Sequence, residues 1–551
     1  MPRQLVTGAA QDVGRLMAGP DAPTPRLAEL TAYVNGRVYT LDPALPVAEA
    51  LACHAGRIVA VGLTEQMRDL GAFPSRVIDL GGRAVVPGFT DAHIHALGLG
   101  LSLGQLELSA CSSLAQCLDL VRERARGLPP GRWLLGRGWN QNGWPEARWP
   151  TRQDLDAVCA ENPVALQSKD GHLLWVNSLA LSTAGVGLHS PDPDGGEIVR
   201  DSSGWPSGLL KENATEAVHK AIPEPTASEI DEALMRMMDH ALRLGVTGIG
   251  NFEGPEVLRA FGRLRASGRL RLRVTQHIAH AFLDQAIDSG LTSGLGDEWL
   301  RVGSLKLFAD GTLGSQTAWM IEPFDGSSNN RGIAVLTAER MREAARRAEA
   351  AGIATAIHAI GDRANREALG ALAAAPAVAA MPHRIEHAQL VHPDDLLQFA
   401  RHGIVASMQP IHAVGDRDTA DRYWGERCAT AYAWRSLLES GAILAFGSDA
   451  PVESCDPLSG LYAATARHGI GDGREPWRPE QALSVQAALH AYTVGSAQAT
   501  GESAIKGTLA PGKVADFVVL SDDIVAGGAE AIARTRVIKT VVAGEVAVGD
   551  A

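Results

Sequence analysis

Two histidines stand two residues apart at the end of an apolar run near residue 90. His93 and His95 lie in the segment PGFTDAHIHA. Because alternate residues of a β-strand point to the same face, both imidazoles can bind one metal ion. The chain has 17 His, so an HxH triplet alone is weak evidence, and two solvated histidines explain it equally well. The position at the end of a strand-like run favours the metal site.

Three more candidate ligands lie near the ends of later apolar runs. His358 lies in ATAIHAIGD, His387 in HRIEHAQL and Asp449 in AILAFGSDA. One histidine at such a place is more often a hydrogen-bonded structural group. Four histidines and a carboxylate at the ends of successive runs are harder to explain that way. Imidazole and carboxylate together suit zinc or a similar divalent ion, and this set can hold one or two ions.

A lysine interrupts another apolar run. Lys306 lies in SLKLFADG, where burial of an unpaired ammonium group costs several kcal/mol. We therefore expect something to compensate its charge. A bound anion, an ion pair with Asp310 and conversion of the amine to a carbamate would each do so.

The elements that must position these residues alternate between strands and helices. Eight apolar runs read as strands, and the segments between them show apolar spacing near 3.6 residues, as in 337–352. Helices of this kind commonly end at glycine, here Gly352 and Gly403. Repeated βα units predict a parallel sheet. Eight of them predict an α/β fold, a closed (β/α)8 TIM barrel with its site at the carboxyl ends of the strands.

Both ends of the 551-residue chain consist of short β-like runs, one of which contains Asn35-Gly36, a dipeptide typical of a tight hairpin. We expect the two ends to form one small domain. A long stretch after the first barrel strand breaks the βα rhythm and reads as an insertion. The predicted parts are a flexible leader at 1–26, a β-sandwich domain from 27–83 and 500–551, a barrel at 84–499 and, within it, a subdomain over the active-site mouth at 100–225.

Composition narrows the class of protein. The chain has 50 Lys+Arg against 63 Asp+Glu, a formal net charge of -13, which repels nucleic acid and anionic lipid. No apolar run approaches the roughly 20 residues that cross a bilayer. The six cysteines form no CxxC pair, as expected in a reducing cytoplasm. We expect a cytoplasmic protein with a small-molecule substrate and neither nucleic-acid nor membrane partners; a homo-oligomer is left open.

Taken together, the motifs resemble those of the amidohydrolase superfamily, in the metal-dependent hydrolase branch that includes N-substituted formamide deformylase. The resemblance runs from about Leu27 to the C-terminus. It is carried by the segments PGFTDAHIHA, GRGWNQNGWPE, SKDGHLLWVNSLAL, SLKLFADGTLGSQTAW, AIHAIGDRAN, HRIEHAQLV, SMQPIHA, FGSDAPVES and KGTLAPGKVADFVVL.

The resemblance implies a role for individual residues. The resemblance implies a divalent metal cofactor, first of all zinc, present as one ion or two. Where two ions are bound, it implies that Lys306 is carboxylated and bridges them. Trp139 and His172 are expected at the substrate pocket, with packing inside the insertion as the alternative. Asp310 and His412 are the other expected substrate-binding residues. The implied metal ligands are His93, His95, Lys306, His358, His387 and Asp449.

The expected reaction is hydrolysis of a non-peptide C–N bond, in an N-acyl or N-formyl amine or an amide, by attack of metal-bound hydroxide. Asp449 is the expected catalytic residue, because a carboxylate there can take the proton of water and pass it to the leaving nitrogen. Asn140 stands where the usual GWDQ motif has aspartate, so a neutral amide replaces a carboxylate. The alternatives are a deaminase of heterocyclic amines and a non-catalytic amidohydrolase-like scaffold.

Overall fold

The computed structural model describes residues 29–68, 70, 76–141, 144–169, 171–375 and 378–549, so the predicted leader lies outside the described residues. The chain forms two compact units. The first contains the described residues up to Gly100 together with Asp231 onward, and the second is Leu101–Ile230. In the described part of the chain, no helix is long and apolar enough to cross a membrane.

The first unit is built on an eight-stranded parallel sheet in which every strand lies beside its neighbour in sequence. The backbone N–H groups of Ser448 and Asp449 donate to the carbonyl of His93 at 3.3 and 2.7 Å, which joins the last strand to the first. The predicted TIM barrel is confirmed, with all eight predicted strands. They are β8 (Phe89–Ile94), β15 (Val246–Asn251), β16 (Arg273–Ala279), β17 (Leu300–Phe308), β18 (Thr355–Ala359), β19 (Arg384–His387), β20 (Val405–Met408) and β21 (Leu444–Phe446).

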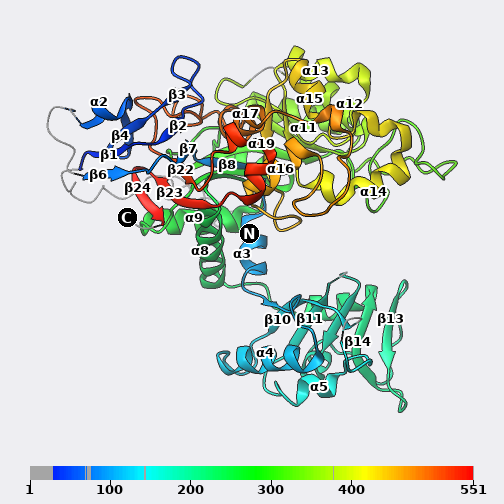
Figure 1. Cartoon of the computed structure of the whole chain (residues 1–551). Coiled ribbons are helices and arrows are strands. Elements are labelled where there is room, and N and C mark those ends of the chain that lie inside the picture. The colour runs from blue at the N-terminus through cyan, green and yellow to red at the C-terminus, as the bar shows by residue number, and fades with distance from the viewer. Residues whose placement is uncertain are drawn as a thin grey trace. The chain divides into compact units, whose positions relative to one another are not determined.

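Helices alternate with these strands (Figure 1). The helix predicted within 337–352 shows why they form: Oγ1 of Thr337 accepts the N–H of Arg340, and Gly352 follows the helix at φ 74°. The helices are α9 (Pro255–Ala266), α10 (Leu283–Asp288), α11 (Ala338–Ala350), α12 (Asp362–Ala373), α13 (Leu396–His402), α14 (His412–Trp424), α15 (Trp434–Glu439), α16 (Pro457–Ala466), α17 (Val485–His490) and α18 (Ser496–Ala499).

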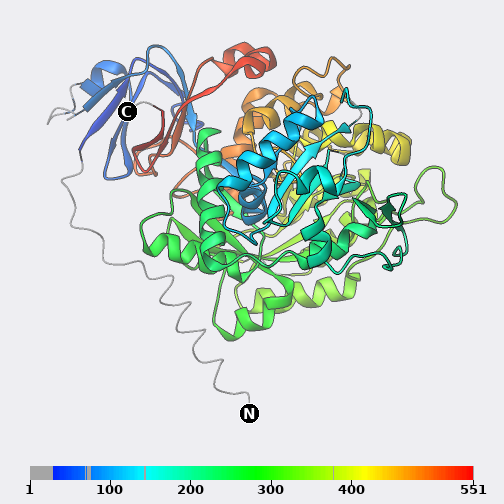
Figure 2. The same ribbon diagram turned by 90° about the horizontal axis from the view of Figure 1, so that it is seen from below.

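Both ends of the chain build a β-sandwich, as Figures 1 and 2 show by the blue and red strands that lie together. The rings of Tyr33 and Phe517 meet edge to face between its sheets, with centroids 4.8 Å apart. One sheet has the order β5 (Arg57–Gly62), β4 (Ala50–His54), β1 (Thr31–Val34) and β6 (Arg76–Asp79). The other has the order β24 (Glu545–Val548), β23 (Val537–Val542), β22 (Phe517–Leu520), β7 (Ala84–Pro87), β2 (Arg37–Tyr39) and β3 (Val47–Ala48). Helix α2 (Thr64–Arg68) packs against β1, β4 and β5, whereas α19 (Ile524–Arg534) packs against α16 and α17 of the barrel.

The hairpin predicted at Asn35-Gly36 is wrong. Asn35 does adopt a left-handed conformation, with φ 56°, but the strands on either side do not pair. Strand β1 pairs with β4 and β6, whereas β2 pairs with β3 and β7. The turn therefore carries the chain from one sheet to the other, and Asn35 is held at the end of β6, where its side-chain amide donates to Asp79 at 2.9 Å.

The second unit has its own six-stranded sheet and core. The chain leaves the first unit within α3 (Ala96–Ser102) and returns within α8 (Ala227–Arg243). The sheet order is β13 (Gly196–Arg200), β14 (Pro206–Glu212), β12 (Leu173–Val176), β11 (Val164–Ser168), β10 (Leu134–Trp139) and β9 (Leu106–Glu107). Its helices are α4 (Leu114–Arg126), α5 (Arg152–Asp156), α6 (Ser178–Thr183) and α7 (Glu216–Ala221).

A buried ion pair fastens the sandwich to the barrel. Arg273 opens β16, and its guanidinium donates to both carboxylate oxygens of Asp516 at 2.6 and 2.9 Å. Both side chains are almost fully buried. Burial in apolar surroundings makes each charge dependent on the other.

We predict that Asp516→Asn lowers the free energy of unfolding by about 3 kcal/mol, because the remaining carboxylate beside the buried Arg273, that of Glu298, is 3.6 Å away and much more exposed. Urea unfolding followed by circular dichroism measures the loss. Glu439→Gln, which removes the exposed ion pair of Glu439 with Arg435, is the control and should change stability little. Equal stability of the two variants would contradict the role of the buried pair.

Candidate functional site

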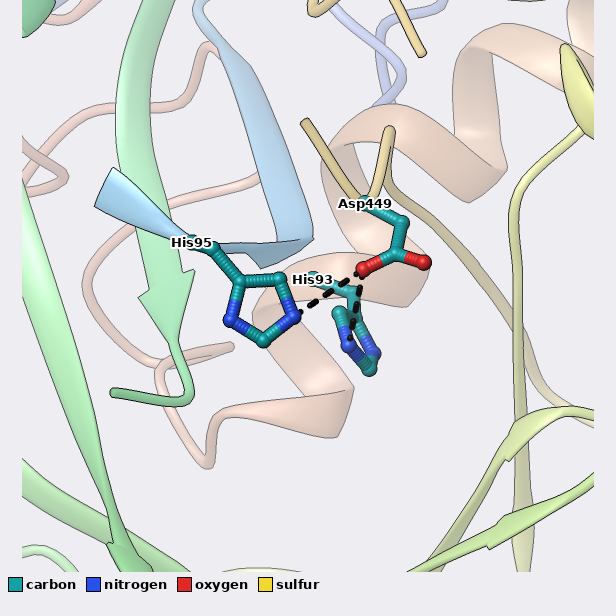
Figure 3. A group of neighbouring side chains, drawn as sticks. All are labelled: His93, His95 and Asp449. Atoms are coloured by element: carbon teal, nitrogen blue, oxygen red, sulfur yellow. Dashed lines mark ion pairs between the residues drawn. The ribbon is translucent and has the colours of Figure 1, made fainter. Parts of the chain in front are cut away.

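The first two histidines and Asp449 meet where the barrel closes. His93 and His95 lie at the end of β8, and Asp449 follows β21. Oδ1 of Asp449 is 3.5 Å from Nε2 of His93 and 3.2 Å from Nε2 of His95. Figure 3 shows both imidazoles directed at the same carboxylate. The three donor atoms lie within 4.8 Å of one another, close enough to bind one ion.

A second group of donors shares the same carboxylate. Its members are His387, His412 and Asp449, again with donor atoms within 4.8 Å of one another. Oδ2 of Asp449 lies 3.4 Å from Nε2 of His412. Asp449 therefore presents one oxygen to each group. His412, predicted to bind substrate, thus lies among the candidate ligands.

Left-handed backbone at two positions aims these side chains. His387 has φ 72° and Asp449 has φ 60°, a conformation that costs energy for residues other than glycine. Neighbouring residues of a strand normally point to opposite faces. Glu386 and His387 are neighbours, yet both contact His93: a Glu386 oxygen lies 2.7 Å from its Nδ1, and the His387 ring centroid lies 4.9 Å from its own. The left-handed turn brings His387 back to the interior.

His358 and Lys306 lie beside the cluster but outside the two donor groups. The ring centroid of His358 is 4.5 Å from that of His387, and its Nε2 donates to the carbonyl of Gly311 at 3.0 Å. The ammonium of Lys306 lies over the rings of Phe252 and Phe308, 4.4 and 5.0 Å from their centroids. Both side chains are buried.

Asp310 does not compensate Lys306, since no ion pair joins these two described residues. The carboxylate of Asp310 instead accepts the backbone N–H groups of Trp319, Ile360 and Gly361 at 2.8 to 3.0 Å. Its Oδ1 also lies 3.5 Å from Nε2 of His358. Burial raises the pKa of Asp310 to about 7, against the effect of those N–H groups. Asp310 thus holds the loops after β17 and β18 together.

Burial keeps three of the imidazoles neutral. It lowers the pKa of His93 to about 4 and that of His358 to about 3, and the nearby charge of Lys306 adds to both shifts. Burial and the neighbouring imidazoles hold the pKa of His387 well below its ordinary value. Neutral imidazole is the form that binds a metal ion. These three side chains are therefore ready to bind a cation at neutral pH.

Asp449 stays ionised in spite of its burial. Burial alone would raise its pKa, but hydrogen bonds from His412 and His95 hold it well below the ordinary range. Burial would lower the pKa of His412, and the bond to Asp449 outweighs it and raises that pKa. The cluster thus combines one anion with the neutral imidazoles of His93, His358 and His387, a donor set that suits zinc and similar ions.

Two expected substrate-binding residues lie in the second unit. Trp139 is fully buried there, its Nε1–H donates to the carbonyl of Leu166 at 2.8 Å, and its ring packs against those of Trp144 and Trp175. His172 is exposed, with Nδ1 3.0 Å from a carboxylate oxygen of Glu212. Within this unit, Trp139 packs in the core and His172 lies at the surface.

Three residues that hold the cluster were not predicted from the sequence. Glu386 accepts from Nδ1 of His93, and Gln409 accepts from Nδ1 of His387 at 2.8 Å. Asp91 accepts the N–H groups of His93 and Ser448 at 3.1 and 2.9 Å and the Ser448 hydroxyl. Burial raises the pKa of Asp91 to about 7. Glu386 could have been predicted from HRIEH in the same way as Lys306, because it too is a charged residue inside an apolar strand.

Comparison with known proteins places this cluster in a family. The sequence profile of the amidohydrolase family matches residues 76–548. The protein YtcJ of Bacillus subtilis (strain 168) is 33% identical over 523 residues, 93% of this chain and 98% of that protein. N-substituted formamide deformylase of Arthrobacter pascens is 30% identical over 528 residues, 93% of this chain and 97% of the relative.

A solved structure is also similar to this chain. An uncharacterized metal-dependent hydrolase from Pyrococcus furiosus superposes with a TM-score of 0.75 at 31% identity, over 90% of this chain and 100% of that one. This chain belongs to the amidohydrolase family.

Proposed function

We propose that the protein is a metal-dependent hydrolase of a non-peptide C–N bond, with an N-acyl or N-formyl amine as its substrate. The observation that carries the proposal is the position of Asp449, whose two oxygens face two groups of histidines at the carboxyl end of the barrel. Barrel enzymes bind their substrates at this end. The 30% identity to N-substituted formamide deformylase supports the choice of bond.

The chain's donors fit a divalent ion, zinc in the first place. The residues proposed to hold it are His93, His95, Lys306, His358, His387 and Asp449, and the geometry adds His412. His93 and His387 each bond through Nδ1 to a protein acceptor, which leaves Nε2 as the ligand atom. A divalent ion held there lowers the pKa of a bound water toward about 7 and polarises a carbonyl group.

Asp449 is placed to move the proton. Its carboxylate is ionised and has His95, 35% exposed, on one side and the buried His412 on the other. An ionised carboxylate can accept the proton that water loses on attack and deliver it to the leaving nitrogen, which otherwise departs as a strongly basic anion. We propose that Asp449 is the general base and then the general acid.

An exposed aromatic ring beside the cluster favours a substrate with an alkyl or aryl group. Phe308 ends β17, is 45% exposed, and its ring centroid is 5.2 Å from that of His358. An aromatic ring left open to solvent next to polar side chains can bury an apolar group of a ligand. This placement supports an N-substituted amide as the substrate.

Cleavage is predicted for N-formyl and N-acyl amines, with release of the amine and the carboxylic acid, when the purified protein carries zinc. Asp449→Asn should keep the fold and lower kcat by about 100- to 10,000-fold, the usual contribution of a positioned acid or base. Asp395→Asn, which alters a buried carboxylate paired with Arg366 of α12, is the control. Release of ammonia instead of an acid would identify a deaminase, and unchanged kcat in Asp449→Asn would refute its role.

We predict that His95→Ala weakens zinc binding by more than the roughly 10- to 100-fold that loss of an outer hydrogen bond costs, because it removes a ligand itself. Competition with a chromogenic chelator measures the affinity. His392→Ala is a matched control, since the side chains of His95 and His392 are 35% and 34% exposed and His392 lies by Asp394, outside both donor groups. Equal affinity in both variants would remove His95 from the ligands.

Lys306 is proposed to exist as a carbamate. Burial lowers its pKa to about 8, against the nearby carboxylates of Glu386 and Asp449, so part of the population is a free amine at neutral pH. Its nitrogen can attack carbon dioxide, forming a C–N bond and releasing a proton to solvent. The resulting anion replaces a buried cation beside the candidate ligands.

For the carbamate, the expected observation is a 13C NMR signal in protein supplied with labelled bicarbonate, and its loss in Lys306→Arg. Lys513→Arg should keep the signal, because the ammonium of Lys513 donates hydrogen bonds to the carbonyls of Ser503 and Lys506. A wild-type protein without the signal would show that Lys306 remains an amine.

A further inference from the structure

A buried ion pair supports His93 from the side away from Asp449. Glu386 lies one residue before His387 and is fully buried. Its Oε2 lies 2.7 Å from Nδ1 of His93, and its two oxygens accept from Nε and Nη2 of Arg384 at 2.5 and 3.0 Å. The Glu386 carboxylate therefore lies between the guanidinium of Arg384 and the imidazole of His93.

Arg384 is itself fixed by three strands. It lies on β19, and its Nη2 donates to the carbonyl of Ala92 on β8 at 2.8 Å and to Oγ of Ser407 on β20 at 2.6 Å. A guanidinium held at several points can keep a carboxylate in one orientation. Replacing such a buried pair by apolar residues often costs no stability, so fold stability alone does not account for the charges inside this barrel.

The contact decides which nitrogen of His93 carries the proton. A carboxylate only accepts hydrogen bonds, so Nδ1 of His93 is the protonated nitrogen. Nε2 then has a free lone pair, and it is this atom that faces Asp449 at 3.5 Å. Without Glu386, the imidazole would be free to take the other tautomer, in which Nε2 carries the proton and cannot bind a cation.

We propose that Glu386, held by Arg384, is the positioning residue that fixes the tautomer and orientation of His93 for metal binding. The inference rests on the proposed function of the cluster and deepens it. Glu386 acts through His93 and does not itself bind the ion. The outer partner of a metal-binding histidine commonly contributes a factor of about 10 to 100 in metal affinity.

A second histidine of the cluster provides an internal comparison. His387 donates from Nδ1 to the amide oxygen of Gln409 at 2.8 Å. A neutral amide therefore accepts the Nδ1–H of His387, as the Glu386 carboxylate accepts that of His93. Glu386→Gln converts the support of His93 to the kind already present at His387. Glu386→Ala removes it. The two variants separate the hydrogen bond from the charge.

The experiment measures Co²⁺ binding to the metal-free full-length protein, by chelator competition and by the visible absorption of the bound ion. We expect Glu386→Ala to raise the Kd by about 10- to 100-fold and to shift the absorption bands, with Glu386→Gln between Glu386→Ala and the wild type. Asp516→Asn is the matched control, because it breaks the buried Arg273 pair far along the chain from the cluster's histidines. It should lower stability and leave the Kd and spectrum unchanged.

Wild-type Kd and spectrum in Glu386→Ala would overturn the inference, and so would an equal loss of affinity in Asp516→Asn, which would mean that a loosened barrel is the cause. A wild-type protein that binds no Co²⁺ or Zn²⁺ would overturn the proposed function itself. The two failures are thus distinguished by the wild-type titration.

Discussion

The hydrogen bond from the N–H of Asp449 to the carbonyl of His93, 2.7 Å long, joins the first barrel strand to the last. The same two residues are candidate metal ligands, so closure of the barrel and assembly of the cluster are one structural event. Asp91 strengthens this junction, because its carboxylate accepts N–H groups from both sides of it. A barrel that failed to close here would also separate the imidazoles of β8 from the carboxylate after β21.

Charge inside the barrel is tolerated because every buried ion has a specific neighbour. Arg384 and Glu386 form an ion pair, and Glu386 also accepts a hydrogen bond from His93. Lys306 lies over the faces of two phenylalanine rings, which attract a cation. The network spans β8, β17 and β19, so these strands share electrostatic as well as backbone contacts. Such a network is costly to bury and supports a cluster that needs ligands in one fixed orientation.

Outside the barrel, the two ends of the chain depend on each other. Strand β7 lies between β22 and β2, so the sandwich cannot form before the last strands are available. The Arg273–Asp516 pair then couples the sandwich to β16. The failed hairpin at Asn35 follows from the same arrangement, since β1 and β2 belong to different sheets.

The sequence by itself determined the eight barrel strands, the helices between them and the strand ends at which His93, His95, His358, His387 and Asp449 lie. Apolar periodicity and chain order carry that information, because they depend on residues close together in the chain. Tertiary structure alone decided the partners of these side chains. The left-handed turn at His387 that lets Glu386 and His387 both reach His93, the sharing of Asp449 by two groups and the sheet that each terminal strand joins all depend on strands distant in sequence. Contacts of this kind form only when the barrel and the sandwich close, and no local pattern encodes them.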